Sequence, residues 1–122
     1  MAKKVLVVED SAVMRSLVTS SLEELMDVET VEACNGLEAF KALPRDRFDL
    51  IVLDLNMPEI NGWEVLRFVK QSELYKNIPV IIVSTDHGDA NMEKGLSLGA
   101  SFYFIKPVEM ERLKETAWHC LN

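Results

Sequence analysis

Five polar residues in this sequence have side chains that suit metal-assisted phosphoryl chemistry. Each lies at the end of a short apolar run, and together they are Glu9, Asp10, Asp54, Ser84 and Lys106. Such runs are typical of strands that are buried on both faces of a parallel sheet. Ligands bind at the carboxyl edge of open α/β sheets, where all parallel strands end. We therefore expect these five side chains to converge at one edge.

The three carboxylates would repel one another unless a cation lies among them. Glu9, Asp10 and Asp54 offer oxygen ligands only, and the backbone carbonyl of Asn56 is well placed to add another. Oxygen ligands with few protein carboxylates fit Mg²⁺, which retains part of its water shell. With Mg²⁺ and Lys106 neutralising a phosphoryl group, Asp54 is an available nucleophile, and the product would be an aspartyl phosphate.

Each of these residues also has an ordinary structural interpretation when it is taken alone. Asp54 and Ser84 can be plain turn residues, since both types are common in turns. The acids at positions 9 and 10 can be charges that favour a helix start, and Lys106 can be a solvated surface lysine. The coincidence of all five at strand ends is what favours a site.

Strands and helices in strict alternation must position this edge. Strands are expected at residues 4–8, 28–33, 50–54, 80–83 and 102–105. Helices are expected at residues 12–26, 36–43, 63–72, 89–98 and from 109 to near the C-terminus. Ser11 is the expected N-cap of the first helix, and Pro44 should help to stop the second. The alternation predicts a doubly wound α/β fold with right-handed crossovers.

Length and composition narrow the class of protein. The 122 residues are expected to form one domain, residues 1–122, and the net charge of −7 argues against a nucleic-acid partner. No apolar stretch approaches the roughly 18 residues of a membrane span, and no export signal is evident, which favours the cytoplasm. Cys34 and Cys120 are far apart in the sequence and are expected to be reduced thiols.

The sequence resembles the receiver domain of two-component response regulators, and it looks most like the stand-alone chemotaxis type. The likeness extends from Lys4 to Leu121. It is carried by the motifs Val-Leu-Val-Val-Glu9-Asp10, Asp54-Leu-Asn-Met-Pro58 with Gly62, Ser84-Thr85 and Lys106-Pro107. The resemblance implies a flavodoxin-like (βα)5 fold with strand order 2-1-3-4-5 and a cis peptide bond before Pro107.

The resemblance also implies a role for each site residue. Asp54 would be the phosphoacceptor and Lys106 the phosphate-contacting lysine. Glu9, Asp10, Asp54 and the Asn56 carbonyl would hold Mg²⁺. Ser84 and Tyr103 would be the switch residues, while Asn56 and Asp86 would tune hydrolysis of the aspartyl phosphate. The departures are mild: Glu stands at position 9 where Asp is commoner, Ser84 where Thr is frequent, and Thr85 where Ala is frequent.

Such a protein would be a signalling switch and not an enzyme, although it catalyses the Mg²⁺-dependent phosphorylation and dephosphorylation of its own Asp54. A histidine kinase or phosphotransfer protein would donate the phosphoryl group. Since no output domain is expected after the last helix, a downstream protein would read the face formed by the fourth helix, fifth strand and fifth helix. Candidate contacts there are Met92, Lys94, Tyr103, the neighbours of Lys106, and Trp118. The protein is expected to be either a monomer or a phosphorylation-dependent dimer.

Three other functions fit the sequence less well. A haloacid-dehalogenase-type phosphatase needs a second acid two residues after the nucleophile, where this chain has Asn56. A flavin or nucleotide carrier needs a glycine-rich phosphate loop after the first strand, where this chain has acids instead. The nearer alternative is a receiver-fold interaction module that acts without phosphorylation.

Overall fold

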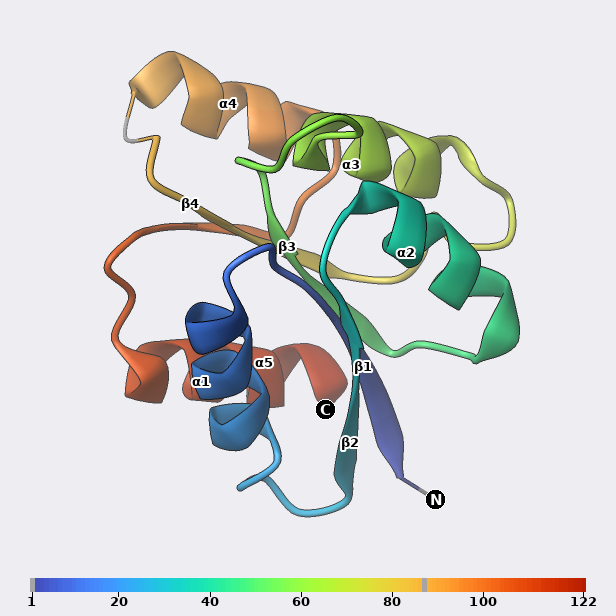
Figure 1. Ribbon diagram of the computed structural model, residues 1–122, viewed down its shortest axis with the longest axis vertical. Coiled ribbons are helices and arrows are strands. Elements are labelled where there is room, and N and C mark those ends of the chain that lie inside the picture. The colour runs from blue at the N-terminus through green and yellow to red at the C-terminus, as the bar shows by residue number, and fades with distance from the viewer. Residues whose placement is uncertain (1, 87) are drawn as a thin grey trace.

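A computed structural model describes residues 2–86 and 88–122, and within these ranges the chain forms one five-stranded parallel sheet (Figure 1). The strands are β1 (Lys3–Val8), β2 (Val28–Ala33), β3 (Leu50–Asp54), β4 (Val80–Ser84) and β5 (Phe102–Ile105). The helices are α1 (Ala12–Leu22), α2 (Gly36–Ala42), the short 3-10 helix η1 (Leu43–Arg45), α3 (Gly62–Gln71), α4 (Asp89–Ser97) and α5 (Met110–Leu121). The strand order β2-β1-β3-β4-β5 confirms the expected flavodoxin-like fold.

The helices cover both faces of the sheet. Helices α1 and α5 lie on one face, and α2, α3 and α4 lie on the other (Figure 1). The central strand β3 is buried along its whole length. Its residues Ile51 and Leu53 pack in the core beneath α2 and α3, whereas Leu50 and Val52 pack in the core beneath α1 and α5. The strand that carries Asp54 is therefore fixed from both sides.

Three helices start at the carboxyl edge of the sheet with a side-chain cap. The Ser11, Asn35 and Asn61 side chains each accept a hydrogen bond from the backbone N–H three residues later, at 3.2, 2.8 and 3.1 Å. These caps satisfy N–H groups that the helices leave without an internal partner. They also fix where the chain turns from strand to helix around the site.

Two predicted helix ends differ from the structure. Helix α1 ends at Leu22 and does not reach Met26, because the chain turns and Asp27 takes a left-handed φ of 59°. Leu25 still packs against the core from this turn, which imitates helical spacing in the sequence, whereas Met26 is exposed. Helix α2 ends at Ala42, one residue before its predicted end, and Pro44 follows within η1, where its missing N–H costs little.

Other expectations can be compared directly with the described residues. The Lys106–Pro107 peptide bond is cis, as the resemblance implies. Cys34 and Cys120 are both free thiols. None of the helices in the described ranges combines the length and the apolar character needed to cross a bilayer.

Gly62 provides a test of how tightly β3 and α3 meet. A Cβ at this position would lie 2.3 Å from the Asp54 backbone oxygen and 2.6 Å from the Leu55 Cα. We expect Gly62→Ala to lower the free energy of unfolding by about 3 kcal/mol, because the contacted atoms are backbone and cannot move aside cheaply. Urea unfolding measures this value.

Gly88→Ala is the matched control, since its Cβ would meet nothing nearer than an Asp86 side-chain oxygen at 3.4 Å. We expect it to cost less than about 1 kcal/mol. Equal losses in the two variants would contradict the close approach of α3 to Asp54.

Candidate functional site

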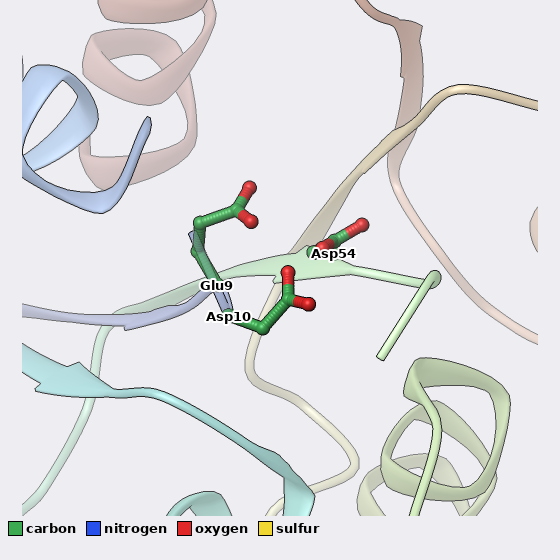
Figure 2. Close-up of side chains that lie close together, drawn as sticks. All are labelled: Glu9, Asp10 and Asp54. Atoms are coloured by element: carbon green, nitrogen blue, oxygen red, sulfur yellow. The ribbon is translucent and has the colours of Figure 1, made fainter. Parts of the chain in front are cut away.

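The register of the sheet brings the acidic residues together. Val8 of β1 is paired with Leu53 of β3, so Glu9 and Asp54, which follow them, lie side by side. Figure 2 shows the carboxylates of Glu9, Asp10 and Asp54 gathered at the ends of these two strands. One oxygen of each lies within 4.8 Å of the others. The predicted convergence of the three acids is thus present.

The three acids differ in how they are held. Glu9 and Asp54 are only 4% and 2% exposed, whereas Asp10 is exposed. The backbone N–H of Ser11 donates to Glu9 Oε2 at 3.1 Å, and the backbone N–H of Asn56 donates to Asp54 Oδ1 at 3.0 Å. Each buried carboxylate is therefore oriented by the loop that follows its own strand.

Lys106 reaches into the same cluster from the end of β5. Its Nζ lies 2.8 Å from Glu9 Oε1 and 3.6 Å from Asp54 Oδ2, and its side chain is 18% exposed. Burial lowers the pKa of Lys106, but the hydrogen bond to Glu9 and the charges of Asp54, Glu9 and Asp10 outweigh burial and raise it above its ordinary value. Lys106 is thus a charged member of the site and not a solvated surface lysine.

The charge in the cluster is not balanced. Burial, and then the neighbouring charge of Glu9, raise the pKa of Asp54 to about 7, although the Asn56 N–H and Lys106 act in the opposite direction. Among the described residues, Lys106 is the cation in contact with this cluster of three carboxylates, and it contacts Glu9 and Asp54. An all-oxygen cluster with this excess of negative charge fits a hard divalent cation held by Glu9, Asp10 and Asp54.

Ser84 links the acid cluster to the following loop. It is completely buried at the end of β4, and its Oγ accepts from the Asp86 backbone N–H at 3.0 Å and from Asn56 Nδ2 at 3.3 Å. Asn56 Nδ2 also donates to Thr85 Oγ1 at 2.6 Å. The Tyr103 hydroxyl donates to the Asp86 carbonyl at 2.9 Å. Hydrogen bonds therefore run from the site to β5 through one loop.

Several predicted roles stay predictions. The Asp86 carboxylate, expected to tune hydrolysis, is occupied at the start of α4, where its oxygens accept from the Gly88 N–H at 3.0 Å and from the Asn91 side chain. No contact tests the Asn56 carbonyl as a cation ligand.

The candidate output residues do not all lie together. Trp118 is 49% exposed and lines a hollow with Lys3, Met26 and Asp27, beside the amino ends of β1 and β2. Lys94 lies over the Trp63 ring of α3, 4.4 Å from its centroid. Trp118 is therefore at the end of the sheet remote from the acids, so it does not extend a surface around the site.

Arg15 is a residue of this region that the sequence reasoning missed. Its Nη1 donates to the Glu9 backbone carbonyl at 2.8 Å, and its Nε donates to Glu32 Oε1 at 2.9 Å. One signal was present, because Arg15 is the only charged residue of the segment 12–22 and lies five positions after Asp10.

The raised pKa of Asp54 predicts a pH-dependent gain in stability for Asp54→Asn. A carboxyl whose pKa is raised by folding stabilises the folded state at pH values below its pKa in the unfolded chain. This contribution is lost as the pH rises through the folded-state pKa of about 7. In EDTA we expect the variant to be about 2 kcal/mol more stable than the native protein at pH 8.5, and nearly equal at pH 5.

Urea unfolding at the two pH values measures this difference. Asp10→Asn is the control, because Asp10 is exposed and its replacement should increase the free energy of unfolding by less. A gain for Asp54→Asn that is the same at both pH values would contradict the assignment.

Comparison with known proteins gives the family. Residues 5–117 match the family model of the response regulator receiver domain. A chemotaxis protein CheY homolog of Campylobacter jejuni is 35% identical over 113 residues, which are 92% of this chain and 87% of the relative.

Solved structures agree with the sequence relatives. The structure of chemotaxis protein CheY4 of Vibrio cholerae matches with a TM-score of 0.90 and 31% identity, covering 99% of this chain and 100% of that chain. The Mn(2+)-bound form of response regulator Rcp1 matches with a TM-score of 0.83 and 31% identity, covering 96% of this chain and 90% of that chain. This chain therefore belongs to the response regulator receiver domain family, as a chemotaxis-type signalling switch of the phosphorylation class.

Proposed function

We propose that Asp54 accepts a phosphoryl group from a histidine kinase or a phosphotransfer protein in the cytoplasm, in a reaction that needs Mg²⁺. The observation that carries this proposal is a carboxylate almost fully buried between two further acids and a lysine. Asp54 shares the cluster with Glu9 and Asp10, and its Oδ2 is 3.6 Å from Lys106 Nζ. A nucleophile beside concentrated positive charge is what phosphoryl transfer requires.

In the proposed reaction an Asp54 oxygen attacks phosphorus, and the bond from phosphorus to the donor nitrogen breaks. The electron pair of that bond leaves with the imidazole. The ammonium of Lys106 neutralises charge on the phosphoryl oxygens, and the Asn56 N–H keeps the Asp54 carboxylate in a fixed orientation. When bound by Glu9, Asp10 and Asp54, Mg²⁺ supplies further positive charge to the phosphoryl oxygens. The Mn(2+)-bound form of the related Rcp1 supports a divalent cation in such a domain.

The contacts of Ser84 support a path by which phosphorylation is read. A phosphoryl group on Asp54 offers new acceptor oxygens to the buried Ser84 hydroxyl. Ser84 Oγ also accepts a hydrogen bond from the Asp86 N–H, and the Asp86 carbonyl accepts one from the Tyr103 hydroxyl. A shift of Ser84 toward the phosphoryl group would therefore move the loop before α4 and change the surroundings of Tyr103.

The same path favours α4, β5 and α5 as the face that a downstream protein reads. Leu96 on α4 and Ile105 on β5 are 47% and 37% exposed, so apolar side chains are available there. Within residues 2–86 and 88–122, strand β5 lies at the edge of the sheet and pairs only with β4. A module that acts without phosphorylation would use the same surface, but it would leave the buried Asp54 cluster without a role.

The phosphorylation chemistry can be tested by intact mass after incubation with acetyl phosphate. We expect a gain of about 80 Da, one phosphoryl group, that requires Mg²⁺ and is absent in Asp54→Asn. The Asn side chain fills the same volume but is not a nucleophile, which makes it the matched variant.

A known receiver domain modified in parallel shows that the reagent is active. If the native protein gains no mass under those conditions, the interaction module that acts without phosphorylation becomes the better assignment.

The path from Ser84 through Asp86 to Tyr103 can be tested by nuclear magnetic resonance with beryllofluoride as a phosphoryl mimic. We expect the amide resonances of α4 and β5 to shift in the native protein, because Ser84 is connected to them through Asp86 and Tyr103. In Ser84→Ala the shifts should stay within the ends of β1 and β3. Equal shifts of α4 and β5 in both proteins would show that the signal does not pass through the Ser84 hydroxyl.

A further inference from the structure

Asp10 is the acid of the cluster whose position needs an explanation. Its carboxylate is exposed, and it makes no hydrogen bond to any residue that the structure describes. By contrast, Glu9 and Asp54 are buried and oriented by backbone N–H groups. The place of Asp10 within the cluster is therefore set by the backbone of the β1–α1 turn alone.

Arg15 holds this turn at the residue before Asp10. The Glu9 N–H continues the sheet by donating to the Ala33 carbonyl at 3.0 Å, but the Glu9 carbonyl lies beyond the ladder. Arg15 Nη1 donates to that carbonyl at 2.8 Å. Because Glu9 is only 4% exposed, the loss of this donor would leave a buried acceptor without its partner. The turn would then have to shift to satisfy the carbonyl.

Arg15 is itself aimed by a second contact. Its Nε donates to Glu32 Oε1 at 2.9 Å, and its side chain is 19% exposed. The guanidinium is a planar group with donors in fixed directions, so the bond to Glu32 also sets the direction of the N–H that meets Glu9. A lysine ammonium has one nitrogen and cannot span both acceptors in this way.

We infer that Arg15 is a positioning residue for the cation site, acting through the Glu9 main chain to place Asp10. This inference rests on the proposed function, since it concerns the cation that the acid cluster would hold. Groups that orient metal ligands without touching the metal typically change affinity by about 10- to 100-fold when they are removed. Arg15 would likewise orient Glu9 and Asp10 without itself contacting the cation.

The test uses the sign of the change in Mg²⁺ affinity. Removing a positive charge near an acidic site would by itself tighten cation binding. Loss of positioning would weaken it. By isothermal titration calorimetry with Mg²⁺ alone, we expect Arg15→Gln to raise the dissociation constant about 10-fold. Arg67→Gln, which removes the same charge from an exposed position on α3, should leave the constant unchanged or lower it.

Arg15→Lys separates positioning from charge and guards against a variant that fails to fold. It keeps the positive charge but loses the planar group whose donors point in fixed directions. We therefore expect the dissociation constant for Mg²⁺ to rise about 5-fold, while the midpoint of thermal unfolding in EDTA stays close to that of the native protein. Electron paramagnetic resonance of added Mn²⁺ gives an independent second readout. Native Mg²⁺ affinity in Arg15→Lys, or tighter binding in Arg15→Gln, would overturn the inference. Absence of Mg²⁺ binding in the native protein would instead count against the proposed function.

Discussion

The structure depends on one electrostatic constraint, the gathering of like charges at the carboxyl edge of a parallel sheet. Glu9 and Asp54 are nearly inaccessible to solvent and repel each other, with Lys106 as the cation in contact with both. The apolar strands that carry them supply the opposing free energy, since each fully buried aliphatic side chain contributes roughly 1.5–3 kcal/mol. Helices on both faces of β3 prevent the strand from sliding to relieve the repulsion. The packed core thus holds the carboxylates together against their mutual repulsion.

The polar groups around the cluster divide into two kinds. Backbone donors at Ser11 and Asn56 orient the buried carboxylates, and these bonds lie within loops that the helix caps fix. The Ser84 hydroxyl, in contrast, accepts two hydrogen bonds and donates none to the residues that the structure describes, so its proton can serve a new acceptor. The two buried acids are therefore fixed in orientation, while the hydroxyl can change partner. A site that must bind the same ligands repeatedly and still report its state needs both properties.

The sequence predicted the fold well because hydrophobic periodicity and turn residues agree along the whole chain. All five strands and the convergence of Glu9, Asp54 and Lys106 follow from that pattern. The end of α1 could not be predicted, since Leu25 packs from a turn and mimics helical spacing. Arg15 was missed for a different reason. Its contact is to a main-chain carbonyl, and the one signal in the sequence, a single charged residue in the segment 12–22, does not identify that acceptor. The position of Trp118 beside the amino ends of β1 and β2 could not be predicted, because residue spacing does not report that α5 packs against α1.

The two cations at this edge differ in what they contact, and that difference bears on the switch. Lys106 is a compact charge bonded to carboxylate oxygens, so the oxygens of a phosphoryl group can compete for it. Arg15 is directed at a backbone carbonyl and at Glu32, neither of which changes when Asp54 is modified. Phosphorylation would therefore redistribute the contacts of Lys106 and leave those of Arg15 in place. On the proposed function, the β1–α1 turn would be the fixed side of the site, and the movement would pass from Ser84 through Asp86 to α4 and β5.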